Sequence, residues 1–228
     1  MKPKLILLHG ALGSMAIFKD LTEELNEYFD VFTLNFSGHG GKAFATERFS
    51  MPLFTKELRQ FIVEQKLAPA QIFGYSMGGY IALWLATYEP NLVKSVFTLG
   101  TKLKWSEEEA QKEIKLLVAD KIENKIPGFA LQLFERHKPN DWKKTVSQTA
   151  LLIENLGKHH LSQNDFTSLK AHVKLTIGDK DSMVTTDETH QTHQLIPNSQ
   201  FKILPDTIHP FEKVNTFMLA EEIKLFFL

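Results

Sequence analysis

The chain has 228 residues, a formal net charge of −1 and no cysteine. This length suits a single domain with a full hydrophobic core, and the near-zero charge excludes an overall field that would attract nucleic acid or an anionic membrane. The lack of cysteine excludes disulfides, thiol catalysis and cysteine metal sites.

The first structural signal along the chain is a short apolar run directly before His9-Gly10. The run has four residues, 5–8, whereas the apolar core of a signal peptide has roughly 7–15, so we interpret it as a buried strand. No apolar run reaches the ~18 residues of a membrane span. We therefore expect a soluble, cytoplasmic protein with no membrane span.

Strands and helices are predicted to alternate along most of the chain. The predicted strands cover residues 4–8, 31–36, 70–75, 93–99, 173–178 and 200–204. The predicted helices cover residues 17–28, 54–65, 77–88, 185–195 and 210–227. This alternation predicts an α/β fold with a mostly parallel, six-stranded sheet and helices on both faces. The loops that follow the strands then meet at one edge of the sheet, where ligands bind in such folds.

The strand pattern stops between residues 102 and 170. Helices are predicted there over residues 106–125, 129–136, 141–155 and 162–169. The segment is too long for a plain connection, so we expect a helical cap insertion that lies over the sheet edge. The chain is then one domain overall, with residues 1–101 and 171–228 as its core and residues 102–170 as the cap.

The chemistry depends on Gly74-Tyr75-Ser76-Met77-Gly78, a G-x-S-x-G motif between a predicted strand and a predicted helix. A sharp turn at this motif forces the serine into a strained backbone conformation, and side chains at the flanking glycine positions would collide. The serine hydroxyl then projects at a helix N-terminus, beside unpaired N–H groups. Ser76 is therefore the candidate nucleophile.

A serine hydroxyl needs a base, and His209 is the best placed of the nine histidines because it follows the last predicted strand. The imidazole in turn needs a carboxylate that fixes its tautomer. Asp179 and Asp181 both follow the preceding strand. Asp181 is preferred because it lies further into the loop, whereas Asp179 is expected to be a turn residue that bonds its own backbone. The candidate catalytic residues are thus Ser76, Asp181 and His209.

Negative charge that develops on a substrate carbonyl requires two N–H donors, an oxyanion hole. One donor is expected from the backbone of Met77, the residue after the nucleophile. The other is expected from Ala11 in the loop after the first strand, with Leu12 as the alternative.

Five stretches together resemble the α/β-hydrolase superfamily over the whole length of the chain. They are His9-Gly10 with Gly13, Ser37-Gly38-His39-Gly40, Gly74 to Gly79, Gly178 to Asp181, and Ile208 to Val214. The resemblance implies a catalytic triad of nucleophile, acid and base at Ser76, Asp181 and His209. It also implies an oxyanion N–H at Ala11 and a helical cap. Small esterases and thioesterase-like or lyase-like members look most similar.

The chain departs from the family pattern in two places. Almost nothing precedes Lys4, where family members usually begin with a hairpin, so we expect a shortened, all-parallel sheet of six strands. Asn35-Phe36-Ser37 stands where family members often carry Asp-x-Arg, so any salt bridge built on that pair is absent.

These residues predict a serine hydrolase of the carboxylesterase type. It would cleave a small-molecule ester or thioester with a small to medium acyl group through an acyl-enzyme intermediate. The candidate pocket residues are Leu12, Trp105, Phe129, Phe134 and Trp142, although the cap aromatics are equally suited to packing on the sheet. The same catalytic residues also suit carbon–carbon bond hydrolysis or a lyase reaction, and the fold also suits a binding protein without activity.

Neither a cofactor nor a metal is predicted. The histidine pairs His159-His160 and His190/His193 have no convincing third ligand nearby in the sequence. His9 and His39 are expected to hold loop backbones rather than to take part in the reaction.

Overall fold

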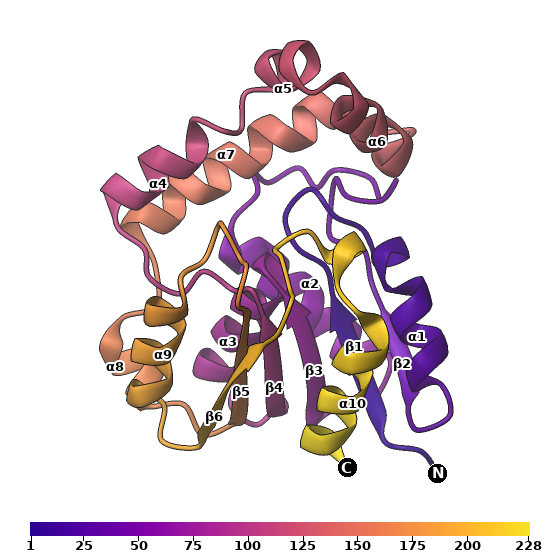
Figure 1. The fold of residues 1–228 in the computed structure, drawn as a ribbon, viewed down its shortest axis with the longest axis vertical. Coiled ribbons are helices and arrows are strands. Elements are labelled where there is room, and N and C mark those ends of the chain that lie inside the picture. Colours follow the sequence, from indigo (N-terminus) through magenta and orange to yellow (C-terminus); the bar gives the residue numbers. More distant parts are fainter.

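The computed structural model describes residues 1–228 and contains one sheet of six strands. The strands are β1 (Lys4–Leu8), β2 (Asp30–Thr33), β3 (Ala70–Tyr75), β4 (Val93–Leu99), β5 (His172–Gly178) and β6 (Ser199–Leu204). They lie in the order β2-β1-β3-β4-β5-β6, and every neighbouring pair is parallel. The expected six-stranded, all-parallel sheet is thus confirmed, and its strands all point toward the same edge (Figure 1).

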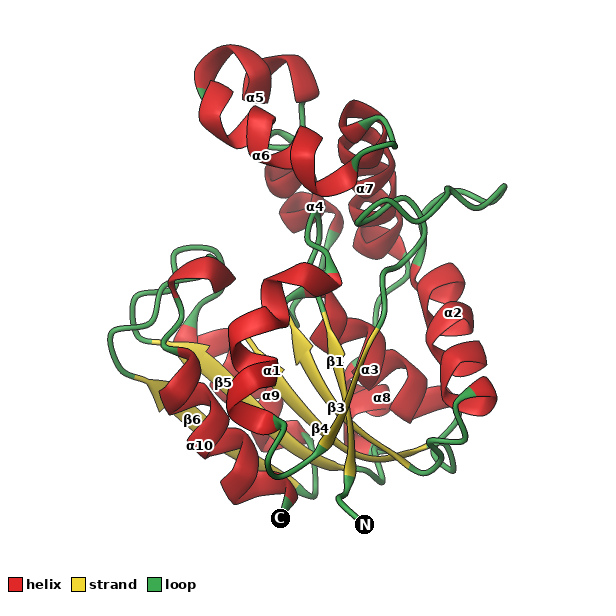
Figure 2. Cartoon of the chain, turned by 90° about the vertical axis from the view of Figure 1, so that its right-hand side faces the viewer, coloured by secondary structure: helices red, strands yellow, loops and turns green.

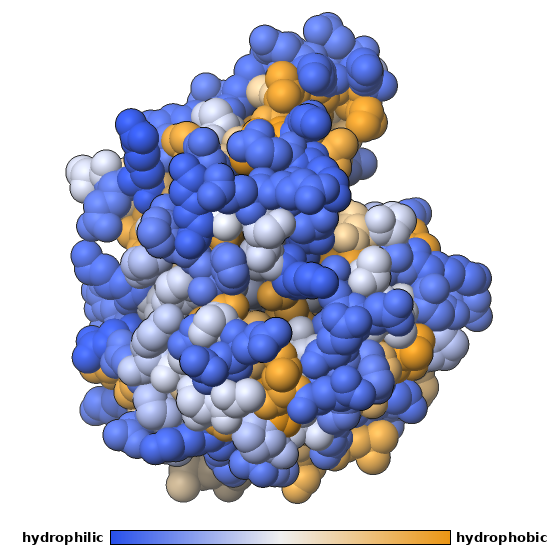
Figure 3. All heavy atoms as spheres, turned by 90° about the vertical axis from the view of Figure 1, so that its left-hand side faces the viewer, coloured by the Kyte–Doolittle hydropathy of each residue, from blue (hydrophilic) through white to orange (hydrophobic).

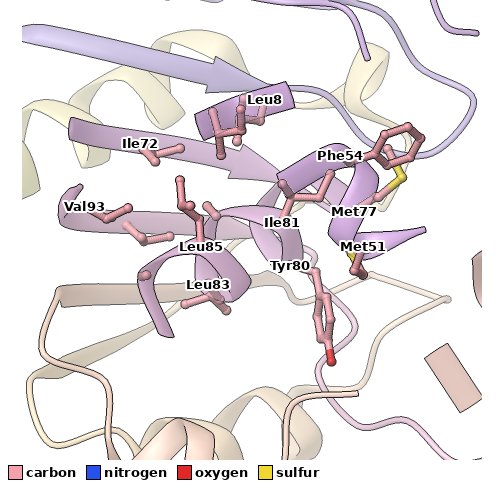
Figure 4. Packing of buried hydrophobic residues seen from close by; sticks show 14 of the residues in the cluster. Leu8, Met51, Phe54, Ile72, Met77, Tyr80, Ile81, Leu83, Leu85 and Val93 are labelled. Atoms are coloured by element: carbon pink, nitrogen blue, oxygen red, sulfur yellow. The ribbon is translucent and has the colours of Figure 1, made fainter. Parts of the chain in front are cut away.

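Helices cover both faces of this sheet (Figure 2). One face carries α1 (Lys19–Leu25) and α10 (Thr216–Phe227), and the other carries α2 (Met51–Glu64), α3 (Met77–Tyr88), α8 (Gln163–Thr167) and α9 (Thr186–Leu195). Successive residues of β1 alternate between the two hydrophobic clusters that result, with Leu5 in one and Ile6 in the other. On the second face, Ile81 of α3 packs over Leu8 and Ile72 of the strands (Figure 4).

Four helices between β4 and β5 stand above the carboxyl ends of the strands (Figure 1). They are α4 (Glu107–Ile114), α5 (Ala119–Lys125), α6 (Pro127–His137) and α7 (Trp142–Lys158), and we call them the upper helical layer. Helix α8, which ends the same inserted segment, lies instead beside α9 at the level of the sheet (Figure 1). None of the helices combines the length and hydrophobicity that crossing a bilayer requires.

Several element boundaries differ from the sequence prediction. The helix predicted over residues 106–125 is two helices, because the chain makes tight turns around Leu116 and Leu117 between them. Helix α2 begins earlier than predicted, after Ser50, whose hydroxyl accepts the N–H of Leu53. Helix α10 begins later than predicted, at Thr216, because the side chain of Asn215 caps it. Strand β2 ends at Thr33 rather than at residue 36.

Candidate active site

Ser76 occupies the tight turn between β3 and α3, with φ of 51° and ψ of −119°. Such a conformation costs a non-glycine residue roughly 1–3 kcal/mol, so the surrounding structure must hold it in place. A Cβ on Gly74 would lie 2.4 Å from the Cα of Gly79, and a Cβ on Gly78 would lie 2.3 Å from the carbonyl oxygen of Leu8. The turn can therefore form only because the residues two positions before and two positions after Ser76 are both glycine.

Hydrogen bonds fix the backbone of Ser76 on both sides. Its N–H donates to the carbonyl of Leu99 at 2.9 Å, and its carbonyl accepts the hydroxyl of Thr101 at 2.9 Å. Met77 follows as the first residue of α3, where backbone N–H groups have no acceptor within the helix. The turn thus presents a hydroxyl together with a free N–H at the positive end of a helix.

His209 is paired with Asp181, and its Nδ1 donates to Oδ2 of that carboxylate at 2.7 Å. The other oxygen, Oδ1, accepts the N–H groups of Met183 at 2.8 Å and Val184 at 2.9 Å. Burial alone would raise the pKa of the Asp181 carboxyl, but the bond to His209 and these N–H groups outweigh it and lower the pKa. The carboxylate is therefore charged at neutral pH and holds the imidazole with Nε2 free to accept a proton.

The neighbouring carboxylate, Asp179, has a different place. Its Oδ1 accepts the N–H of Thr207 at 3.0 Å, and this bond joins the loop after β5 to the loop after β6. The structure therefore brings Asp181, and not Asp179, to the imidazole of His209.

Gly100, at the end of β4, shows how closely these loops approach one another. It has φ of +60°, and a Cβ there would lie 3.1 Å from Oδ2 of Asp181 and 3.3 Å from Nδ1 of His209. Only glycine adopts this conformation at little cost and leaves room for both side chains.

A cavity of about 90 Å³ lies between the sheet edge and the upper helical layer, and both Ser76 and His209 line it. Ala11 and Met77, the two expected N–H donors, line it as well. Most of the remaining wall is apolar and consists of Met51, Tyr80, Trp105, Leu152, Ile153, Leu156, Met183 and Val184. The candidate nucleophile, base and oxyanion donors therefore share one small, largely apolar chamber.

Two charged residues, Lys102 and Glu113, complete the wall of the cavity. Nζ of Lys102 lies 3.1 Å from a carboxylate oxygen of Glu109, 3.8 Å from Glu188 and 4.0 Å from Glu113. Burial raises the pKa of the Glu113 carboxyl, although the lysine opposes this shift. Of these carboxylates only that of Glu113 lines the cavity with Lys102, and Glu109 is also paired with Lys112 at 2.9 Å, so this end of the cavity carries one acidic and one basic side chain.

Of the predicted pocket residues, only Trp105 lines the cavity. Leu12, Phe129 and Trp142 instead pack together in a separate hydrophobic cluster of the upper helical layer. Phe134 is 48% exposed, and it belongs to a set of exposed apolar side chains on this layer with Leu116, Val118, Ile126 and Leu131. Figure 3 shows hydrophobic atoms gathered near the top of the molecule. The expectation for these four residues is corrected, because Leu12, Phe129 and Trp142 serve a separate hydrophobic core and Phe134 is exposed.

Three histidines, His9, His39 and His137, form a buried row beside the site. Their rings lie 5.1 Å and 5.6 Å apart in that order, centroid to centroid. Nδ1 of His9 bonds the carbonyl of Gly10 at 2.8 Å, and Nδ1 of His39 bonds the carbonyl of Ser37 at 3.0 Å. Burial lowers the pKa of His9 and of His137 to about 4 and that of His39 well below its usual value. These rings are therefore neutral at physiological pH, and their nitrogens form hydrogen bonds with backbone groups of the neighbouring loops.

A parallel sheet in this strand order, with a strained serine between a central strand and the following helix, is the architecture of an α/β hydrolase. Residues 3–121, more than half of the chain, match the family of the alpha/beta hydrolase fold. The chain belongs to this family.

Its relatives include esterases. Over 241 aligned residues the chain is 24% identical to a pimeloyl-[acyl-carrier protein] methyl ester esterase of Aliivibrio fischeri, a match that covers 95% of this chain and 91% of that protein. Over 103 residues it is 32% identical to a probable alcohol acetyltransferase of Cyberlindnera fabianii, with 43% of this chain and 28% of that protein covered. The chain spans only 28% to 34% of the length of several curated relatives that it matches.

Among solved structures, a hydrolase from Pseudomonas aeruginosa resembles this chain with a TM-score of 0.82 at 13% identity. The match covers 99% of this chain and 89% of that one. At this level of identity the likeness establishes the fold alone.

Proposed function

We propose that this protein is a serine esterase that cleaves short, uncharged acyl esters or thioesters through an acyl-enzyme. Its triad is Ser76, His209 and Asp181, and the upper helical layer is the cap of its acyl pocket. The observation that carries the proposal is the presence of Ser76 in one cavity with an imidazole that Asp181 holds at 2.7 Å.

In the proposed reaction, the hydroxyl of Ser76 attacks the substrate carbonyl while Nε2 of His209 takes its proton. The N–H groups of Ala11 and Met77 stabilise the tetrahedral oxyanion. His209 then protonates the leaving alcohol or thiol, and the acyl group stays on Ser76. A water molecule that the same imidazole activates releases the acid and restores the serine.

The size and polarity of the cavity support a short acyl chain. A volume of about 90 Å³ holds roughly six to nine atoms of water size, since each needs about 10–15 Å³ of such space. The walls beside Ser76 are apolar, and the charged end of the cavity carries one carboxylate, Glu113, and one ammonium, Lys102. We therefore expect acetyl to hexanoyl esters to react faster than long-chain or anionic ones.

The test combines covalent labelling with turnover. A fluorophosphonate should modify Ser76, and Ser76→Ala should abolish labelling and lower kcat for p-nitrophenyl butyrate by at least about 10³-fold. Ser147→Ala, at an exposed position of α7, is the matched control and should behave as wild type. Labelling of a different residue, or unchanged turnover in Ser76→Ala, would refute the proposal. A lack of ester turnover combined with a tightly bound carboxylate would favour a lyase reaction, and ligand-induced stabilisation without any turnover would favour a binding role.

A second candidate is transfer of the acyl group to an alcohol. It is favoured by the 32% identity to the protein named probable alcohol acetyltransferase and by a cavity small enough for acetyl. With ethanol present, formation of ethyl ester beyond the uncatalysed background would support transfer. Release of free acid alone would leave hydrolysis as the sole reaction.

A further inference from the structure

Two adjacent residues at the end of α6, Arg136 and His137, reach from the upper helical layer to one carbonyl of the core. Nη1 of Arg136 donates to the carbonyl oxygen of Leu12 at 2.9 Å, and Nε2 of His137 lies 3.1 Å from the same oxygen. Nδ1 of His137 accepts the N–H of Gly40 at 3.1 Å. The proton of this neutral ring therefore sits on Nε2, so both side chains donate to Leu12.

The carbonyl that they hold belongs to a residue in an unfavourable conformation. Leu12 has φ of 57°, which a branched side chain adopts only when its surroundings enforce it. It lies inside a tight turn that the N–H of Gly13 closes by donating to the carbonyl of Gly10 at 3.1 Å. The two donors from α6 fix the peptide group between Leu12 and Gly13, which is the last peptide group of the turn.

The same turn sets the direction of the N–H of Ala11. The carbonyl of Gly10 accepts two hydrogen bonds, from Gly13 and from Nδ1 of His9. Because carbonyl and N–H point in opposite directions across a trans peptide, these bonds direct the N–H of Ala11 away from the turn interior. Ala11 lines the cavity with Ser76.

We propose that Arg136 and His137 are positioning residues that hold the Leu12 turn closed and so aim the N–H of Ala11 at the oxyanion. This inference rests on the proposed esterase function. Nη2 of Arg136 also donates to Glu212 at 2.7 Å, three residues beyond His209. One helix end of the upper layer thus ties together the loop of the oxyanion donor and the loop of the base.

The test compares His137→Ala, Arg136→Ala and the double variant. Complete loss of an oxyanion donor costs about 10²–10³-fold in kcat, so a loosened donor should cost about tenfold in either single variant and about 100-fold in the double variant. KM should stay within about twofold because the apolar walls are unchanged. Affinity for a trifluoromethyl ketone, which forms a tetrahedral adduct, should fall in parallel with kcat/KM. His137→Gln keeps an N–H donor and should recover part of the loss.

The matched control is Thr145→Val, which removes another hydrogen bond between the upper layer and the core, from Thr145 to the carbonyl of Gly38 at 2.9 Å. It should lower stability without lowering kcat. If Thr145→Val and His137→Ala lose equal stability and both keep kcat, the clamp that Arg136 and His137 form on the Leu12 carbonyl is merely structural and the proposal is wrong.

A second readout does not depend on turnover. Amide hydrogen exchange of Gly13, whose N–H closes the turn, should quicken in His137→Ala and in Arg136→Ala but not in Thr145→Val. Unchanged exchange would overturn the proposal even if kcat falls. If fluorophosphonate does not label Ser76 in the wild-type protein, the esterase function itself is refuted. Faster Gly13 exchange in the variants would then show that Arg136 and His137 hold the turn without a catalytic role, and the present inference would be overturned as well.

Discussion

Acidification from about pH 7 to about pH 5 should lower the free energy of unfolding through the buried histidine row. Burial lowers the pKa of His9 and His137 from 6.5 to about 4. In the unfolded chain these rings bind protons below their ordinary pKa, whereas in the folded chain they stay neutral. Their contribution to stability is therefore fully present above pH 6.5 and is lost as the pH falls toward 4.

The size of the effect follows from the two pKa values. A shift from 6.5 to about 4 gives each ring about 2 kcal/mol of lost stability between about pH 7 and about pH 5, hence about 4 kcal/mol for His9 and His137 together. The lowered pKa of His39 adds a loss in the same direction. This is a large part of the roughly 5–15 kcal/mol that a domain has in total. We would measure it by urea denaturation, followed by tryptophan fluorescence, at a series of pH values.

One variant isolates the contribution of a single ring. His137→Gln removes a titrating group but keeps an N–H donor toward Leu12, so its loss of stability over the same pH range should be smaller by about 2 kcal/mol. His159→Gln, at an exposed position, serves as control and should follow the wild-type profile. A His137→Gln profile parallel to that of wild type would refute the reasoning, because it would mean that the folded protein holds this ring with an ordinary pKa.

Two further predictions concern the site. Asp181→Asn should lower kcat by about 10³–10⁴-fold, because the imidazole loses the acceptor that fixes its tautomer, whereas Asp179→Asn should change kcat little; equal losses measured with p-nitrophenyl butyrate would contradict the assignment. Glu113→Gln should raise kcat/KM for a dicarboxylic acid monoester about tenfold relative to the neutral ester, since it removes a negative charge, worth ~1.4 kcal/mol, from the cavity wall. Glu108→Gln, on the same helix but outside the cavity, should not change this ratio.

The sheet was predictable because its signals are local. Each strand is a short apolar run, and the serine turn needs glycine at Gly74 and Gly78 for reasons visible in the spacing alone. The pairing of Asp181 with His209 was predictable once parallel strands placed both loops at one edge. Strand β2 was predicted too long because the apolar Leu34 and Phe36 are buried outside the sheet. Apolar character alone does not distinguish a strand from a buried loop.

The pocket was not predictable to the same degree. The side chains Met51, Leu152 and Leu156 line the cavity, but in the sequence they belong to ordinary amphipathic helices. Which apolar positions face the sheet edge depends on how α7 crosses it, and this is a tertiary property. The clamp of Arg136 and His137 on Leu12 spans more than 120 residues of sequence, and no local pattern indicates it.

The attachment of the upper helical layer to the chain has an evolutionary consequence. The proposed triad comes from loops outside residues 102–170, while Trp105, Leu152, Ile153 and Leu156 of the apolar cavity lining come from inside this segment. Substitutions within residues 102–170 can therefore change the substrate selectivity without replacing a residue of the proposed triad. A graft of this segment from a related protein would keep both contacts to the Leu12 carbonyl only if the donor brought side chains equivalent to Arg136 and His137.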